Sequence, residues 1–328
     1  MTITPVESIM ATNPEHARLP VDPEFHYGAA FANGQYCDIT KATVPLLDLG
    51  FNQADAAYDV VSVSKGYFFR LEDHLDRFDS ACEKFLLTNP YSRQETIDIL
   101  SELVRLSGTR EAYVWWAVTR GLLRDSTRRT DPASYDHAFY AYAVPYKFIS
   151  NDEQRARGID VYVSKRYIRI PSKAVDPTAK NFHWMDLKLS LFEAGAAGKE
   201  WSVLCDQDGY LTEAPGTNLF IVKNGQVFTP GTGCLEGITR KSALELSREL
   251  GYPTWAAKVH VEQLYDADEA FMTSTAGGIM PINTADGHVL GGADGPGAIT
   301  TRLHNLYWEK RWAGWHGTPV NYQRQRTA

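Results

Sequence analysis

Cysteine is scarce in this sequence, and long uncharged runs are missing from it. The 328 residues include four scattered cysteines and no Cys-x-x-C pair, which argues against a disulfide framework and against a cysteine-based zinc site. No uncharged stretch approaches the length of a membrane-spanning helix, and residues 1–20 lack a basic segment followed by an apolar one. We therefore expect a cytoplasmic protein with reduced thiols and without a bound metal.

Basic residues are also fewer than acidic residues in this sequence. Lysine and arginine number 33 against 40 acidic residues, which gives a net charge of -7. This balance argues against a surface that binds nucleic acid or an anionic membrane, and the basic cluster at residues 124–129 is too small to reverse it. Hydrophobic residues make up 44% of the chain, a globular composition, and the length exceeds that of one ordinary domain. We therefore expect two domains that share a cleft.

Sequence patterns divide the chain into four parts. Residues 1–25 are predicted to form an N-terminal arm, because several prolines discourage regular structure there. A small α/β domain is expected at 26–145, an interdomain linker at 146–157 and a larger α/β domain at 158–328. Strand patterns mixed with helix patterns predict the α+β class rather than a doubly wound sheet.

Hydrophobic periodicity locates the expected elements. In the first domain, strands are predicted at 57–64, 67–69, 112–119 and 138–144, and helices at 75–86 and 92–106. In the second domain, strands are predicted at 160–164, 202–205, 218–222 and 270–274, and helices at 182–194, 240–250 and 300–312. The turn residues Lys65 and Gly66 predict a hairpin between the first two strands.

Two charged residues are candidates for chemistry rather than for the surface. Lys180 is surrounded by apolar and aromatic residues in the segment 179–184. A lone lysine is usually a solvated surface residue, but burial there would favour the neutral amine that a Schiff-base lysine needs. Glu213 follows a predicted turn, so it is either an exposed acid of a hairpin or a carboxylate that keeps a pyridinium nitrogen protonated.

Three further segments contain residues that suit an anion. The segment 235–240 precedes a predicted helix, where a glycine allows close backbone approach and Thr239 is a candidate N-cap. The segment 273–278 follows a strand and either holds an anion or forms a turn. Arg77, three residues after His74, either binds a phosphate with its bidentate guanidinium group or is an exposed charged residue.

The order of these motifs resembles that of the class IV aminotransferases, the fold type IV pyridoxal phosphate (PLP) enzymes. His74 and Arg77 are followed by Lys180, then by Glu213, and then by the segments 237–240 and 273–275. The combination of Glu213 with Asn218-Leu-Phe and Gly237-Ile-Thr-Arg is highly specific, and the similarity spans residues 31–308. The resemblance implies two domains with PLP at their interface, and homodimers whose active sites borrow residues across the interface.

The resemblance also implies a role for each motif. Lys180 would hold PLP as a Schiff base and then shuttle the proton, and Glu213 would bind the pyridine nitrogen. Leu235 would pack on the ring face opposite the lysine. The phosphate would be held by residues from three segments, which are Arg77, Ile238, Thr239 and Thr275.

Within the family, the best match is the (R)-selective amine transaminases. It rests on the stretches 110–114, 118–121, 142–146 and 180–186. We therefore predict the transfer of an amino group from an (R)-configured primary amine to a keto acid such as pyruvate. Carried over by position, the substrate pocket would be lined by Tyr58, Tyr113, Trp115, Trp184 and Ala276, and Arg128 would bind the carboxylate of the acceptor.

Several departures from that group leave details open. Arg124 and Arg129 are alternatives to Arg128, and Gln53 stands where relatives often have histidine. Trp115 stands where branched-chain enzymes usually have an arginine, which favours an apolar amine over an amino acid. These aromatic residues could equally pack in the core, although strand alternation places Trp115 and its neighbour Trp116 on opposite faces.

Other functions compete with this prediction. The alternative is a D-amino-acid or branched-chain amino-acid aminotransferase, and an aminodeoxychorismate lyase is a further one that no feature demands. A non-catalytic protein of this fold that acts by binding is disfavoured, because Lys180 and Glu213 are both present. The expected partners are an amine donor, a keto-acid or ketone acceptor and a second copy of the chain, with neither nucleic acid nor membrane.

Overall fold

The protein, a computed structural model described for residues 1–292 and 295–323, divides into two compact units. Unit 1 contains Met1–Ile9, Phe148–Thr178 and His183–Ala313. Unit 2 contains Met10–Lys147, Ala179–Phe182 and the segment that begins at Gly314. The short segment Ala179–Phe182 and the C-terminal segment thus belong with the first half of the chain, although the sequence pattern assigned both to the second domain.

Unit 2 is built on a seven-stranded sheet in the order β15-β4-β3-β5-β6-β1-β2, with antiparallel neighbours throughout. The strands are β1 (Ala29–Ala32), β2 (Gln35–Asp38), β3 (Ala56–Ser64), β4 (Tyr67–Phe69), β5 (Ala112–Leu123), β6 (Tyr135–Pro145) and β15 (Gly317–Pro319). The predicted hairpin joins β3 and β4, because Lys65 and Gly66 adopt φ values of 51° and 82°, as a tight two-residue turn requires.

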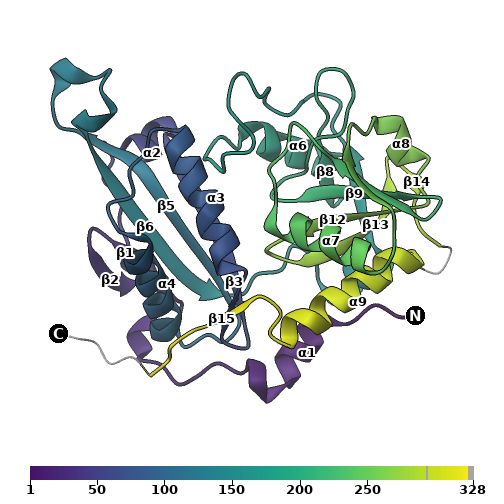
Figure 1. Cartoon of the computed structure of the whole chain (residues 1–328), viewed down its shortest axis with the longest axis horizontal. Coiled ribbons are helices and arrows are strands. Elements are labelled where there is room, and N and C mark those ends of the chain that lie inside the picture. Colours follow the sequence, from purple (N-terminus) through teal and green to yellow (C-terminus); the bar gives the residue numbers. More distant parts are fainter. Residues whose placement is uncertain (293–294, 324–328) are drawn as a thin grey trace. The chain divides into compact units, whose positions relative to one another are not determined.

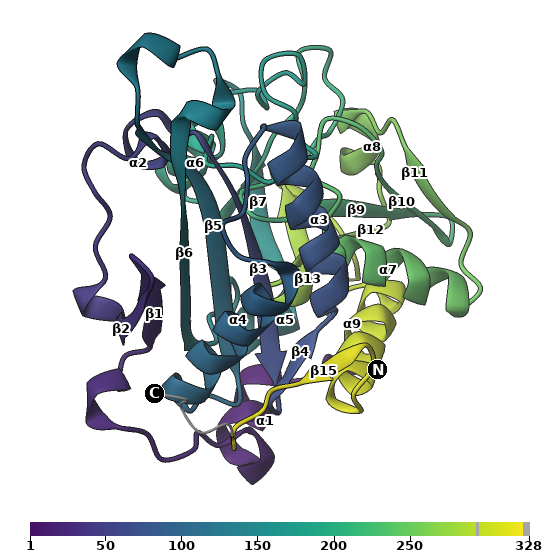
Figure 2. The same ribbon diagram turned by 60° about the vertical axis from the view of Figure 1, so that its left-hand side comes forward.

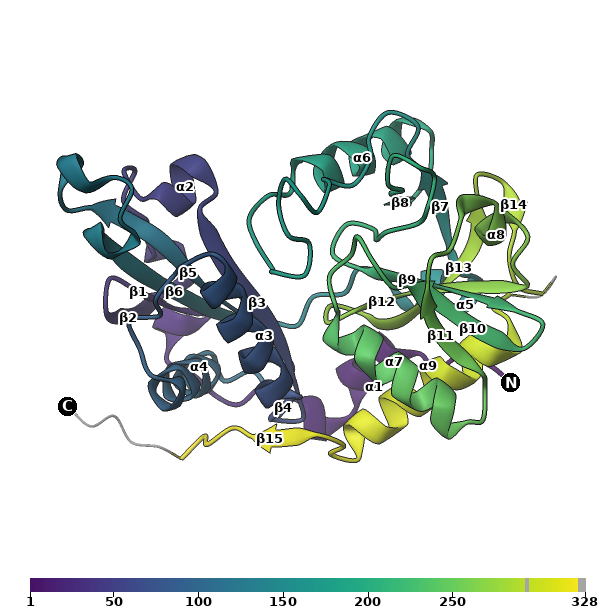
Figure 3. The same cartoon turned by 45° about the horizontal axis from the view of Figure 1, so that its top comes forward.

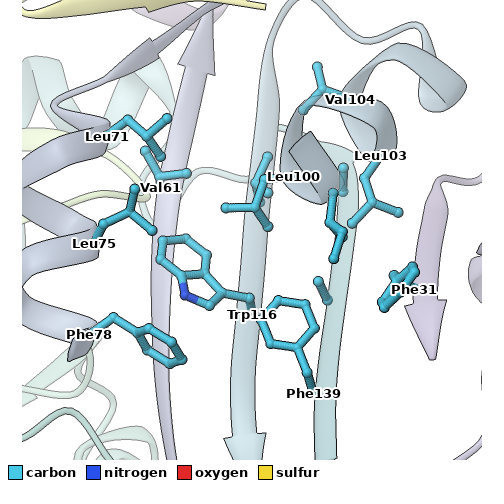
Figure 4. Close-up of a cluster of buried hydrophobic side chains, with 14 of the residues drawn as sticks. Phe31, Val61, Leu71, Leu75, Phe78, Leu100, Leu103, Val104, Trp116 and Phe139 are labelled. Carbon is cyan, nitrogen blue, oxygen red and sulfur yellow. The ribbon is translucent and has the colours of Figure 1, made fainter. Parts of the chain in front are cut away.

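Two long helices cover one face of this sheet (Figure 2). They are α3 (Leu71–Lys84) and α4 (Arg93–Ser107), and a short helix, α2 (Leu49–Gln53), precedes β3. Ser92 and Glu95 form a reciprocal capping box at the start of α4. Figure 4 shows side chains of both helices packed against the sheet around Trp116, among them Leu75, Phe78, Leu100 and Leu103. Trp116 is fully buried in this core, as strand alternation predicts.

Unit 1 is built on an eight-stranded mixed sheet in the order β11-β10-β9-β12-β13-β7-β8, and β14 pairs with β13. The strands are β7 (Ile159–Val163), β8 (Trp201–Val203), β9 (Asn218–Lys223), β10 (Gln226–Pro230), β11 (Thr254–Ala257), β12 (Glu269–Ser274), β13 (Gly278–Ala285) and β14 (His288–Val289). Neighbours are parallel at β10 and β11, at β13 and β7, and at β7 and β8. The two sheets confirm the α+β class.

Within the residues that the structure describes, five further helices lie wholly in unit 1. They are α5 (Asp152–Arg157), α6 (Met185–Ala196), α7 (Ile238–Glu249), α8 (Val261–Tyr265) and α9 (Ala298–Trp312). Helices α7 and α9 lie side by side against β12 and β13 (Figure 3). This packing fixes the start of α7 next to strands β9 and β12, which is where several candidate residues lie.

Two segments that were expected to be irregular contain helices. In the predicted arm, α1 (Val6–Thr12) begins directly after Pro5, because the fixed φ of proline suits the start of a helix. In the predicted linker, α5 begins with a capping box formed by Asn151 and Gln154. All four cysteines are free thiols. Among residues 1–292 and 295–323, no helix has the length and apolar character to cross a membrane.

Candidate active site

Lys180 lies beside strand β3 of unit 2. The backbone N–H of Tyr58 donates to the carbonyl oxygen of Lys180 at 3.0 Å, and Asn181 forms an antiparallel bridge with Ala57. This short pairing holds a segment from far along the chain at the beginning of β3. As a result, the half-buried Lys180 Nζ lies 4.3 Å from the centre of the Tyr58 ring.

Five aromatic rings gather on the sheet face opposite α3 and α4, and we call them the aromatic cage: Tyr58, Tyr113, Trp115, Tyr142 and Phe182. The ring centres of Tyr58, Trp115 and Phe182 lie 5.6 to 6.0 Å apart. Tyr142 stacks on Trp115 at 5.2 Å with an interplanar angle of 15°. Burial raises the pKa of Tyr113 and of Tyr142, so both hydroxyls stay protonated near neutral pH. The structure thus gathers Tyr58, Tyr113 and Trp115 in one cluster, and Tyr58 lies next to Lys180.

Arg77 is held by a buried carboxylate on β3. Asp59 accepts hydrogen bonds from Arg77 Nε at 2.8 Å and from Arg77 Nη2 at 2.7 Å, and its Oδ1 lies 2.8 Å from His74 Nδ1. Burial by itself raises the pKa of Asp59, but the charge of Arg77 and the hydrogen bonds from His74 and Arg77 outweigh burial and hold the pKa well below its usual range. Burial lowers the pKa of His74, so its ring is neutral near pH 7. The guanidinium is therefore fixed in direction by a partner that the sequence reasoning missed.

Glu213, in unit 1, is not the exposed acid that a simple hairpin would have. It is 6% exposed, and its Oε1 accepts a hydrogen bond from Arg169 Nε at 2.7 Å. Its Oε2 accepts from the backbone N–H of Leu235 at 3.2 Å. Arg169 also donates through Nη1 to Asp186 at 2.7 Å. Burial alone would lower the pKa of Arg169, but the two carboxylates outweigh burial and raise it. Two carboxylates around one guanidinium leave this trio one negative charge in excess.

The start of α7 presents backbone N–H groups in a confined place. Gly237, not Thr239 as predicted, is the N-cap residue, because its backbone is extended while Ile238 already begins the helix. A Cβ at position 237 would lie 2.0 Å from Asn218 Oδ1, so only glycine fits there. Asn218 Nδ2 in turn donates to the carbonyl oxygen of Leu235 at 2.7 Å. Thr239 is buried in the first turn, where backbone N–H groups lack helical partners.

The turn after β12 is fixed by the hydroxyl group of Ser274. Ser274 Oγ donates to the carbonyl oxygen of Gly216 at 3.0 Å and accepts from the backbone N–H of Ala276 at 3.1 Å. The hydroxyl of Thr273 is buried and has no hydrogen-bond partner within residues 1–292 and 295–323. Thr275 and Ala276 follow it in the turn and are half-buried. Unit 1 thus brings Glu213, Leu235 and the start of α7 together through direct contacts.

Other predicted pocket residues lie at the surface of their units. Arg124, Arg128 and Arg129 lie in or at the start of the connection between β5 and β6, which projects beyond the strand ends in Figure 1. Arg124 pairs with Asp136 at 2.9 Å, and Arg128 pairs with Asp131. Trp184, the N-cap residue of α6, is 36% exposed, and Gln53 is exposed at the end of α2.

Sequence reasoning missed the residues that support the candidates. Asp59 carries a charge in the middle of a β-branched strand, and Arg169 lies between two isoleucines. A charge inside an apolar run is the signal that could have identified both. Phe182 and Tyr142 lie in the stretches that carry the resemblance, but the resemblance does not place them in the pocket.

In each unit, the residues present suit the part of PLP that they would contact. The trio of Glu213, Arg169 and Asp186 has an excess negative charge that suits a protonated pyridine nitrogen. The first turn of α7 presents backbone N–H groups that lack helical partners, and such groups suit a phosphate. In unit 2, Lys180 Nζ lies over an aromatic ring.

Comparisons with known proteins agree with a site for PLP. The family model for amino-transferase class IV matches residues 56–285. A branched-chain-amino-acid aminotransferase of Pseudomonas aeruginosa is 30% identical over 86% of this chain and 92% of its own length. A D-alanine aminotransferase of Bacillus licheniformis is 26% identical over 80% of this chain and 91% of its own length. The crystal structure of the branched-chain amino acid aminotransferase from Thermobaculum terrenum in its PLP form matches with a TM-score of 0.78, 25% identity, and coverage of 90% of this chain and 99% of that one.

Proposed function

This chain belongs to the amino-transferase class IV family and is a PLP-dependent aminotransferase, and from that premise we propose that its donor is a branched-chain or similarly apolar amino acid. The acceptor is a keto acid. The observation that carries the proposal is the aromatic cage, a group of rings whose member Tyr58 lies directly beside the Lys180 amine. The branched-chain names of several relatives support the same choice. A D-alanine donor is less suited to the cage, because its methyl group would leave most of the walls without contact.

Lys180 is the proposed catalytic residue. When bound, PLP supplies an electron sink that stabilises the negative charge left after the α-proton is removed. Lys180 Nζ in its neutral form would accept the α-proton of the donor and would later release it. The pairing of Lys180 with the backbone of Tyr58 fixes the start of the side chain, and the ring of Tyr58 lies beside its amine.

The remaining PLP contacts are proposed from the residues of each unit. Glu213, oriented by Arg169 and by the N–H of Leu235, would face the pyridine nitrogen. Leu235 would pack on the ring face opposite Lys180. The phosphate would be bound by Arg77, by the start of α7 at Ile238 and Thr239, and by Thr275.

An (R)-configured primary amine is the second candidate donor, and it is the one that the sequence favoured. The specific observation is Trp115, which is part of the apolar cage at the position where branched-chain enzymes usually have an arginine. Trp184 and Ala276 would contribute to the same pocket. The relatives named above are amino-acid aminotransferases, so the amino acid takes precedence.

Arg128 is the proposed contact for the carboxylate of the keto acid. It would have to leave Asp131, with which it pairs at the surface. Replacing Arg124, Arg128 and Arg129 one at a time by alanine would identify the arginine in use, because the KM for the keto acid should rise in one variant.

We also propose that the protein forms a homodimer and that it is located in the cytoplasm. Apolar residues in and before α2 are exposed on unit 2, including Leu46 and Leu47 at 76% and Phe51 at 64%. An exposed apolar patch of this kind is typical of a surface that another chain covers. The four free thiols suit a reducing compartment.

A donor comparison tests the proposal. The protein loaded with PLP is mixed with L-leucine, D-alanine or (R)-1-phenylethylamine, and the conversion of the cofactor is followed by its absorbance. We expect L-leucine to react fastest. Turnover of the aromatic amine without turnover of L-leucine would replace the first candidate with the second, and no reaction with any amine would contradict both.

A further inference from the structure

An apolar cavity of about 210 Å³ lies in unit 2, and we call it the side cavity. Its walls come from β1, β5 and β6, from the segment before and within α2, and from the segment Ala179–Phe182, and they include Ala30, Phe31, Val44, Phe51, Trp115 and Phe182. An engineered apolar cavity of about 150 Å³ is large enough to bind benzene. The side cavity therefore has room for a phenyl ring or for several methylene groups.

Two hydroxyl groups in the wall of the side cavity, those of Thr119 and Tyr140, are already engaged. Thr119 Oγ1 donates to Asp48 Oδ2 at 2.8 Å, and the hydroxyl of Tyr140 donates to the same oxygen at 3.1 Å. Asp48 is itself buried. Because these polar groups are satisfied, the side cavity offers carbon surfaces, and the group that it suits is an uncharged hydrocarbon.

Trp115 and Phe182 belong both to the side cavity and to the aromatic cage at Lys180. On the cage side, both rings contact Tyr58, whose ring lies under Lys180 Nζ. On the cavity side, Trp115 is backed by Tyr142, which stacks on it at 5.2 Å. The two rings therefore stand between the amine and the side cavity.

We propose that Trp115 is a specificity-determining residue whose indole closes the side cavity to the donor. This inference rests on the proposed function, because it concerns the side chain of the amino donor. With the indole in place, the donor side chain ends at the cage, so short and branched chains are accepted. Without the indole, the cage and the side cavity form one pocket that takes a longer unbranched alkyl chain.

The test compares two donors of different length in wild type and in Trp115→Ala. The quantity measured is the ratio of kcat/KM for L-2-aminooctanoate to kcat/KM for L-norvaline. Each additional buried CH₂ contributes about fourfold, so three of them should raise this ratio on the order of 50-fold in Trp115→Ala. Trp115→Leu should change the ratio in the same direction by less, and it serves if the alanine variant does not fold.

Two matched controls separate the proposed effect from general loosening. Phe51→Ala also removes an aromatic ring from the side cavity, but Phe51 lies outside the aromatic cage and the indole of Trp115 stays in place, so the ratio should not change. Ala30→Leu, added to Trp115→Ala, fills the side cavity and should remove the gain. The same ratio is measured with (R)-2-aminooctane and (R)-2-aminopentane.

The outcomes distinguish the two proposals. A ratio that stays within about threefold of wild type in both Trp115 variants, while L-norvaline still reacts, overturns the role of Trp115 and leaves the amino-acid donor standing. If only the amines react, the amino-acid donor is wrong and the amine ratio decides on Trp115. A wild-type protein that converts none of the four donors contradicts the proposed function and this inference with it.

Discussion

Both units contain a buried carboxylate paired with an arginine, but the two pairs are arranged in opposite ways. In unit 2, Asp59 supports Arg77, and the cationic member is the proposed cofactor contact. In unit 1, Arg169 supports Glu213, and the anionic member is the proposed contact. Unit 2 would then meet the negative phosphate with a cation, and unit 1 would meet the positive pyridine nitrogen with an anion. In each unit, the buried ion pair would then fix the direction of the member that contacts the cofactor.

The two sheets position their candidate binding groups in different ways. The antiparallel sheet of unit 2 has one face covered by α3 and α4 and leaves the other to the aromatic cage and Lys180. The mixed sheet of unit 1 instead places the start of α7 next to Asn218 of β9, and the backbone N–H groups there are the proposed contact for the phosphate. The proposed contacts of unit 2 are side chains, and those of unit 1 also include N–H groups.

The largest expected effect concerns the amine of unit 2. We expect Lys180→Ala to reduce transamination on the order of 10⁶-fold, as the loss of an essential covalent group does in other enzymes. The absorbance of the lysine-bound cofactor should disappear with it. Substantial remaining activity would remove Lys180 from the mechanism, and circular dichroism would establish that the variant is folded.

The next effect concerns the acid of unit 1. Glu213→Gln keeps the shape of the side chain but removes its charge, so PLP should stay bound while kcat falls on the order of 10³-fold. Cofactor content and single-turnover rates check these two expectations separately. A near-normal rate would mean that the partner of the pyridine nitrogen lies elsewhere.

A smaller effect is expected from the supporting arginine of unit 1. Arg169→Met leaves Glu213 and Asp186 without their shared cation, so the free energy of unfolding should fall by about 3 kcal/mol. The rate should fall by about tenfold to a hundredfold, the range for a residue that orients a functional group. Arg169→Lys, which restores the charge, should recover part of the rate, and the pH dependence of the cofactor absorbance should shift in the methionine variant. An unchanged pH profile would reduce Arg169 to a structural role.

The smallest effect is expected from the supporting acid of unit 2. Asp59→Asn should weaken the affinity for PLP by about tenfold, since a hydrogen bond to a charged group contributes about 1.5 kcal/mol. Equilibrium dialysis of the cofactor measures the affinity, and pyridoxal without its phosphate provides the control. If both compounds lose affinity equally, Asp59 does not act through a phosphate contact of Arg77.

The sequence predicted the helices and strands better than it predicted the residues that hold the candidate side chains in place. The strands and helices around Lys180, Glu213 and α7 follow from periodicity and turn residues, and the hairpin at Lys65 and Gly66 is an example. The capping of α7 by Gly237 was missed, because the close approach of Asn218 depends on tertiary packing. The pairs of Asp59 with Arg77 and of Arg169 with Glu213 were missed for the same reason. Such pairs join residues that are 18 and 44 positions apart, so local patterns do not specify them.

A crystal structure of the protein grown with pyridoxal phosphate tests most directly whether residues from the two units act on one ring. Our account predicts continuous density from Lys180 Nζ to the cofactor, with the ring nitrogen within hydrogen-bond distance of the Glu213 carboxylate. Density that joins the cofactor to another lysine, or a ring nitrogen that faces a group other than Glu213, would contradict it.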